Sequence, residues 1–195
     1  RDSISSITTD NVAVLNIDLG RMGNTSAAIK VDDQEISIED STAVLSLSKN
    51  SASWQVSEKP ASDQKGPHRN GGFKDAFRNN MVLVYASKGS KTENEWWYHR
   101  ALFDAEKFYY RGNGNVELVR DTDFSPEKYL DRNVIIYGNS DNNSAWESLL
   151  SSCPVQVENG NISLPGRSFD GEDLGAYFVY PRPDSDIGSV GVVSA

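Results

Sequence analysis

Residues 81–112, MVLVYASKGSKTENEWWYHRALFDAEKFYYRG, hold the clearest pattern in the chain. The run from Met81 to Ala86 is continuously apolar, which is typical of a strand buried on both faces of a sheet. Thr92 and Glu95 form a Thr-x-x-Glu capping box, and Gly112 is placed to end the helix that the box begins. Apolar side chains recur along this segment at helical spacing: Trp97, Tyr98, Ala101, Leu102, Ala105, Phe108 and Tyr109. The stretch therefore predicts a strand, a loop and an amphipathic helix, which is half of a βαβ unit.

The alternation of strand and helix continues downstream of this segment. Residues 116–119 and 133–137 read as strands, and Ser125-Pro126 is typical of a helix start between them. A second, shorter helix is expected around Trp146, and later short strands are expected at 155–157, 161–164, 175–180 and 189–193. Because alternating strands and helices favour a parallel sheet, residues 78–195 are predicted to form a flavodoxin-like three-layer α/β domain with a mostly parallel sheet.

The first third of the chain has a different pattern. Residues 1–58 hold short alternating apolar runs separated by turn signals, which predicts a small antiparallel β-sandwich-like unit. Residues 59–77 are polar and rich in Gly and Pro, as expected for a linker, and His68 is expected to be exposed within it. The fold class predicted for the whole chain is α/β.

Composition excludes several classes of function. The chain has 195 residues and a formal net charge of -9, from 19 basic and 28 acidic side chains. This balance argues against a nucleic-acid partner, which needs a basic surface. The longest apolar run, 81–86, is far short of the roughly 20 residues that cross a bilayer, so no membrane span is expected. Because the chain starts at Arg1 and stops inside a predicted strand, both ends are expected to be cuts.

The sequence offers no recognisable catalytic arrangement. Cys153 is the single cysteine and lies beside apolar residues, which indicates a buried core position. The two histidines, His68 and His99, have no evident serine or cysteine partner, and no Gly-x-Ser-x-Gly elbow occurs. Neither zinc nor EF-hand spacing is present, and loop acids such as Asp121 are expected to be solvated. We therefore predict no catalytic residue, no metal and no cofactor on this chain.

Two loops are candidates for ligand binding, because ligands of open α/β sheets bind beyond the carboxyl ends of the strands. The first holds Ser87, Lys88, Gly89, Ser90 and Thr92, whose hydroxyls and lysine precede a helix N-terminus. The sequence of this loop is similar to the phosphate loop of flavodoxins but lacks that family's Thr/Gly pattern. The alternative to a phosphate or flavin site is an ordinary turn between the strand and the helix.

The second candidate loop follows the predicted strand at 133–137. It holds Gly138, Asn139, Asp141 and Asn142, whose side chains could cap the next helix, bind water or contact a partner. The aromatic side chains offer a further alternative, a sugar-stacking face. Trp97 lies on the helical stripe and is expected to pack in the core, whereas Trp96 lies off its centre and is the candidate for an exposed stacking face.

Three stretches of sequence carry a resemblance to a known family. Residues 9–15 with 29–36 resemble a "T-x-N-V-x-x-L … V-x-I-D-G-Q-x-L" segment, and residues 65–77 resemble a "K-x-P-G-x-x-G-P-I-x-D-A-F" linker. Residues 133–143 and 180–183 resemble "N-L-I-L-F-G-D-x-x-S-N" and "Y-P-N-P". In this order they are similar to the region downstream of the catalytic domain in secreted bacterial hydrolases of the prolyl-oligopeptidase/esterase type. Asp33, Gly72-Phe73 and Asn139 depart from that pattern.

The resemblance implies a non-catalytic C-terminal region, with the α/β-hydrolase domain and its serine located upstream. The expected function is an accessory region of a secreted or periplasmic multidomain hydrolase, which packs on the upstream catalytic domain or shapes access to it. One alternative is a carbohydrate- or peptide-binding module that uses Trp96, Tyr98 and the loop after Tyr137. A second alternative is a domain that binds phosphate or flavin through residues 87–92.

Overall fold

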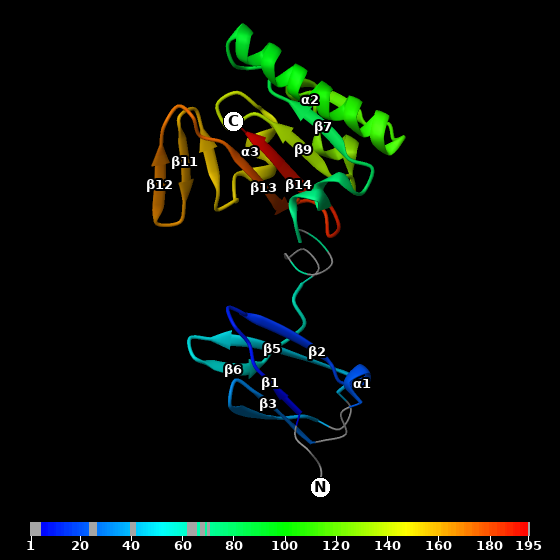
Figure 1. The fold of residues 1–195 in the computed structure, drawn as a ribbon, viewed down its shortest axis with the longest axis vertical. Helices are drawn as coiled ribbons and strands as arrows, with labels where there is room; N and C mark the ends of the chain where they lie inside the picture. Colours follow the sequence, from blue (N-terminus) through cyan, green and yellow to red (C-terminus); the bar gives the residue numbers. More distant parts are fainter. Residues whose placement is uncertain are drawn as a thin grey trace. The chain divides into compact units, whose positions relative to one another are not determined.

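The computed structural model describes residues 5–23, 27–39, 42–61, 66, 69 and 71–194, so the linker histidine His68 lies outside the described residues. The chain divides into two compact units, Arg1–Ala61 and Ser62–Ala195. Each unit is built mainly from strands (Figure 1).

The N-terminal unit contains two three-stranded sheets around one core. One sheet has the order β1 (Ser5–Ile7), β3 (Ala28–Val31) and β4 (Gln34–Ser37), and the other has β2 (Val14–Asp18), β5 (Val44–Asn50) and β6 (Ser53–Val56). The short helix α1 (Leu19–Met22) follows β2. Side chains of both sheets share the core: Ile17, Leu19, Ile29, Val31, Ile36, Leu45, Leu47 and Trp54. The predicted unit was antiparallel throughout, whereas β1 and β3 pair in parallel.

The carboxylate of Asp32 connects the turn between β3 and β4 to three other parts of the N-terminal unit. It accepts hydrogen bonds from the Thr9 backbone N–H (2.6 Å) and hydroxyl, from Trp54 Nε1 (2.9 Å) and from Lys49 Nζ (3.0 Å). These bonds, led by those from the Thr9 hydroxyl and the Trp54 indole, hold the pKa of the Asp32 carboxyl well below its usual range.

We expect the stability of this unit to fall in acid because of Asp32. A carboxyl whose pKa is lower in the folded chain contributes stability above its unfolded pKa of about 4, and loses it as the pH falls further. Urea unfolding at several pH values, followed by the indole resonance of Trp54, should show this loss in the native chain. The variant Asp32→Asn should be less stable at neutral pH and show a flatter acid dependence. The control is Asp33→Asn, whose exposed carboxylate contacts only Lys30 among the described ion pairs; an equal effect there would contradict the assignment.

The main sheet of the C-terminal unit is mixed. Its order is β13 (Ala176–Pro181), β14 (Ser189–Ser194), β9 (Val134–Tyr137), β7 (Val82–Tyr85) and β8 (Glu117–Arg120). Figure 1 labels the first four of these strands. The four strands β14, β9, β7 and β8 are parallel, and β13 pairs antiparallel with β14. Three more strands, β10 (Gln156–Glu158), β11 (Asn161–Leu164) and β12 (Arg167–Asp170), form a separate antiparallel sheet.

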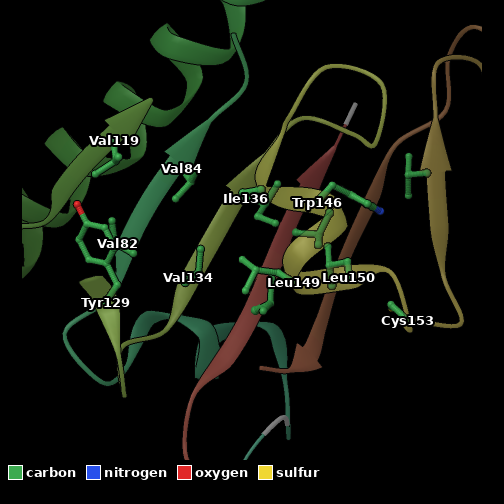
Figure 2. Close-up of a cluster of buried hydrophobic side chains, with 14 residues drawn as sticks. Val82, Val84, Val119, Tyr129, Val134, Ile136, Trp146, Leu149, Leu150 and Cys153 are labelled. Atoms are coloured by element: carbon green, nitrogen blue, oxygen red, sulfur yellow. The ribbon is translucent and has the colours of Figure 1, made fainter. Parts of the chain in front are cut away.

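The two faces of the main sheet carry different partners. On one face, Leu83 and Ile135 belong to a core with Trp97 and Ala101 of the long helix α2 (Lys91–Gly112). The 3-10 helix η1 (Phe73–Phe77) adds Ala76 to this core, although the sequence placed residues 73–77 in the linker. On the other face, valines and isoleucines of the strands pack against Tyr129 and against Trp146, Leu149 and Leu150 of α3 (Ala145–Leu150) (Figure 2).

The predicted α/β fold class, with its flavodoxin-like three-layer domain, is wrong. The described residues form 14 strands in four sheets and three α-helices, of which only α2 is longer than six residues. Where a second crossover helix was expected, the chain forms two 3-10 helices, η2 (Asp121–Asp123) and η3 (Pro126–Tyr129). Ser125 provides no side-chain capping bond to start a longer helix there. After α3 the chain goes into antiparallel strands, so flavodoxin-like layering is not formed.

The start of α2 also differs from the prediction. The capping box is Ser90 with Glu93: Ser90 Oγ accepts from the Glu93 N–H, and Glu93 Oε2 accepts from the Ser90 N–H (2.8 Å). The expected buried stripe is narrower than predicted, because Tyr98 and Tyr109 are exposed. Within the described part of the chain, no helix has the length and apolar character needed to cross a bilayer.

Candidate functional site

The candidate loops follow β7 and β9, which are parallel neighbours in the sheet. After β7 the chain enters α2 on one face, and after β9 it enters α3 on the other. Segments that leave adjacent strands toward opposite faces create a crevice at the carboxyl edge of a sheet, the usual place for a ligand in open α/β sheets. The fold therefore brings residues 87–90 and 138–143 to the same edge.

Hydrogen bonds lock these two loops together. The Lys88 N–H donates to the Asn142 carbonyl (3.0 Å), and Asn143 Nδ2 donates to the carbonyls of Val84 (3.2 Å) and Tyr137 (3.0 Å). Each loop also reaches Asp121, whose carboxylate accepts from the Ser87 hydroxyl and from the backbone N–H (2.6 Å) and hydroxyl (2.7 Å) of Ser144. The crevice is consequently a preformed, rigid feature.

Asp121 was expected to be a solvated loop acid, and this expectation is wrong. Its side chain is buried and bridges the first turn of η2 to both loops. The sequence signal was ambiguous, because an Asp after a strand is equally typical of an exposed turn. Only the spatial approach of Ser87 and Ser144 explains its burial.

The first loop has no free phosphate cradle. The N–H groups of residues 88–90 already have protein acceptors: Lys88 has the Asn142 carbonyl, Gly89 has Asn94 Oδ1 (3.0 Å) and Ser90 has the Glu93 carboxylate. The hydrogen bonds from the Ser90 hydroxyl and N–H lower the pKa of Glu93, so an ionised carboxylate sits at this helix N-terminus. A carboxylate there takes the place and the charge of a bound anion. The geometry gives the phosphate or flavin alternative no support.

The second loop is organised by its own amides. Gly138 has φ +127°, and Asn142 Oδ1 accepts from the Asn139 N–H (2.8 Å). Asn139 Nδ2 donates to Asn159 Oδ1 (2.7 Å) in the turn after β10, and Asn159 N–H donates to Asp141 Oδ2 (2.8 Å). The sequence missed Asn159, because nothing in its local pattern places the β10–β11 turn beside residue 139.

A pocket of about 220 Å³ lies where α2 meets this second loop. Its lining comes from the first turns of α2 and from the asparagines of the loops: Thr92, Glu93, Trp96, Trp97, Asn139, Asn142 and Asn159. Trp96 is 48% exposed and contacts Trp97 edge-to-face, with ring centroids 4.5 Å apart. Of the residues proposed from sequence, the pocket thus unites Thr92, Trp96, Asn139 and Asn142.

The other proposed residues lie elsewhere. Ser87 and Tyr98 line a larger, open hollow of about 900 Å³ at the ends of β7 and β8, together with Arg120. Gly138 is buried at the start of the second loop, and Asp141 is exposed. The Lys88 N–H joins the two loops, whereas Gly89 and Ser90 form hydrogen bonds with Asn94 and Glu93 at the start of α2. The residues proposed from the sequence therefore line two separate hollows or lie in the loops that support them, and they do not form one site.

The groups that could serve as nucleophiles are not arranged for catalysis. Cys153 is buried, and this burial raises the pKa of its thiol, which disfavours the thiolate. His99 is exposed on α2 with its ring beside Tyr98. In the described ranges, no group of three or more His, Cys, Asp or Glu side chains is placed to hold a metal ion.

No protein-family model, curated protein or solved structure matches this chain. The resemblance to hydrolase-associated regions therefore stays a prediction that depends on the sequence motifs alone.

Proposed function

We propose that this chain is a non-catalytic accessory region of an exported multidomain hydrolase, and that its C-terminal unit packs on the catalytic domain. The observation that carries the proposal is the solvent-facing aromatic surface on the C-terminal half of α2. Phe103, Tyr109 and Tyr110 all lie on it, and Tyr110 is 87% exposed. Large exposed aromatic groups are enriched in protein interfaces and mark surfaces that a partner covers.

An apolar groove lies beside these aromatic side chains. It has a volume of about 610 Å³ and lies between α2 and the segment leading into β8, with Leu102, Phe103, Tyr110, Val116 and Leu118 in its lining. β8 ends the main sheet and, among the described strands, pairs only with β7. A groove beside a sheet edge offers a partner both apolar area and backbone groups.

The choice of partner comes from the sequence motifs. They are similar to regions that follow a hydrolase domain, which makes the catalytic domain of the same polypeptide the expected occupant. A partner on the same polypeptide needs only a modest interface, because the chain connection gives it a high effective concentration. This supports a groove of limited size as the contact.

The first test is the reading frame that encodes the chain. We expect it to encode a domain with a Gly-x-Ser-x-Gly elbow upstream of Arg1, and the 195-residue chain itself to leave p-nitrophenyl esters unhydrolysed. A frame without a hydrolase domain would contradict the proposal. So would ester turnover by the chain that a single substitution within it abolishes.

The second test addresses the contact in the full-length polypeptide. The double variant Phe103→Ser, Tyr110→Ser should increase amide hydrogen exchange in β8 and α2 and speed proteolytic release of the region by about tenfold or more, since central interface aromatics each contribute about 2 kcal/mol. The control is Phe169→Ser, because Phe169 is a similarly exposed aromatic residue on β12. Equal effects of the two changes would place the contact elsewhere.

A further inference from the structure

We propose that the pocket between α2 and the loop after β9 binds one neutral sugar ring, stacked on Trp96 and hydrogen-bonded by Asn142. This site is separate from the proposed docking groove, because it lies near the N-terminal end of α2 and the groove lies along the C-terminal half. Fourteen residues separate Trp96 from Tyr110, or about 21 Å along a helix. The site and the proposed docking groove can therefore be tested separately.

The pocket lining contains an unused hydrogen-bond donor. Asn142 is only 1% exposed and lines the pocket. Its Oδ1 is fixed by the Asn139 N–H, and its Nδ2 is buried with no hydrogen-bond partner among the described residues. Buried amide groups are nearly always paired, so an unpaired one beside a pocket indicates a missing acceptor. A ligand hydroxyl or carbonyl oxygen would supply that acceptor.

Trp96 forms an aromatic wall of the pocket. Half of the Trp96 side chain is exposed, while its edge-to-face contact with the buried Trp97 fixes the ring. A rigid, exposed indole face offers apolar contact to a ligand at little cost in conformational entropy. A sugar ring has such an apolar C–H face, with hydroxyl groups around its rim.

The charge of the pocket lining favours a neutral ligand. The ionised Glu93 carboxylate and the Thr92 hydroxyl line the same pocket. An anion would be repelled by Glu93, and the N–H groups of residues 88–90 that could bind it are occupied. A quaternary ammonium ion would suit Trp96 and Glu93, but one without a hydroxyl group, such as tetramethylammonium, carries no acceptor for Asn142. A neutral ligand with hydroxyl groups satisfies all three, because hydroxyls donate to the carboxylate and accept from the amide.

The volume of the pocket limits the size of the ligand. At about 220 Å³ the pocket is smaller than the roughly 300–1,000 Å³ of sites for drug-sized ligands. This volume is suited to one ring rather than to an enclosed oligosaccharide. Asn159, at the exposed end of the pocket, is placed to contact a substituent of that ring.

The experiment measures binding of single-ring probes to the full 195-residue chain by saturation-transfer NMR and by the indole resonance of Trp96. The probes are methyl glucoside, methyl galactoside and N-acetylglucosamine, with tetramethylammonium and inorganic phosphate as cation and anion. At least one sugar should bind and shift the Trp96 resonance, and tetramethylammonium and phosphate should not.

Two variants test the named contacts. Trp96→Ala and Asn142→Asp should each weaken sugar binding by about tenfold or more, as expected when a stacking face or a buried donor is removed. Asn142→Asp keeps the oxygen that accepts from Asn139 and replaces the Nδ2 donor by an oxygen that carries negative charge. The control is Phe169→Ala, at an exposed aromatic residue of β12 outside the pocket, which should bind as the unmodified chain does.

The inference is overturned if none of the sugars binds, if tetramethylammonium or phosphate binds in their place, or if Phe169→Ala weakens binding as much as Trp96→Ala. If Asn142→Asp fails to fold, the comparison of Trp96→Ala with Phe169→Ala still tests the pocket.

Discussion

Replacing Arg182 by methionine should destabilise the C-terminal unit by about 3–5 kcal/mol, the usual cost of removing one partner from a buried charged network. Arg182 is fully buried in the turn between β13 and β14. Its Nε and Nη2 donate to both oxygens of Asp184, at 2.6 and 2.7 Å. Its Nη1 donates to the carbonyls of Tyr129 and Arg132, and Nη2 also donates to that of Pro126 (2.8 Å).

The physical reason for so large an effect is the conformation of the segment between β8 and β9. This segment forms η2 and η3 in place of a crossover helix, so several of its carbonyls have no helical partner. The guanidinium of Arg182 satisfies three of them from outside the segment. Methionine would fill much of the same space but leave those carbonyls and the Asp184 carboxylate without their donor, and each buried unsatisfied group costs about 1–3 kcal/mol.

Urea unfolding followed by the indole resonance of Trp146 measures the effect. Arg167→Met is the control, since Arg167 lies exposed on β12 and its loss should change stability by no more than about 0.5 kcal/mol. Arg182→Lys should lose most of the stabilisation as well, because an ammonium cannot reproduce the forked contacts of a guanidinium. If Arg182→Met cost less than about 1 kcal/mol, the role assigned to this network would be wrong.

Local patterns predicted the elements whose cause is local. The apolar run 81–86 became β7, the helical stripe became α2, and residues 133–137 became β9. In each case burial of a continuous apolar face decides the structure, and the sequence displays that face directly. The capping box was displaced by two residues, because two overlapping Ser/Thr-x-x-Glu patterns occur at 90–93 and 92–95 and both satisfy the same rule.

The features that the sequence could not predict depend on contacts between distant segments. Ser125-Pro126 has the local signature of a helix start, but Arg182, more than fifty residues away, stabilises an irregular segment there. The candidate site has the same character. Asn142 is recognisable as a polar loop residue, whereas its unpaired Nδ2 and its closeness to Trp96 follow only from the packing of the β9 loop against α2.

The variant Gly138→Ala should destabilise the C-terminal unit by about 3 kcal/mol or more and abolish binding of the sugar probes. Two costs add. At φ +127° the backbone is in a region that L side chains rarely adopt, a strain of about 1–3 kcal/mol. The added methyl carbon would also lie 2.5 Å from Asn142 Oδ1 and 2.8 Å from Ala86 Cβ, and relieving such overpacking costs a further 1–3 kcal/mol or so.

The steric part of this cost acts on the candidate site itself. Asn142 Oδ1 must move to make room, and the hydrogen bond from the Asn139 N–H that orients the side chain would be lost with it. The matched control is Gly166→Ala in the turn between β11 and β12. Gly166 has φ +77° but no atom within 4 Å of an added methyl, so it carries the backbone strain without the collision.

Urea unfolding and NMR titration of both glycine variants separate the two contributions. Gly166→Ala should lose about 1 kcal/mol and bind the probe normally. Gly138→Ala should lose clearly more and bind no probe. Equal destabilisation of the two variants would show that the loop after β9 yields to the methyl group, and sugar binding by Gly138→Ala would show that the orientation of Asn142 does not control the pocket.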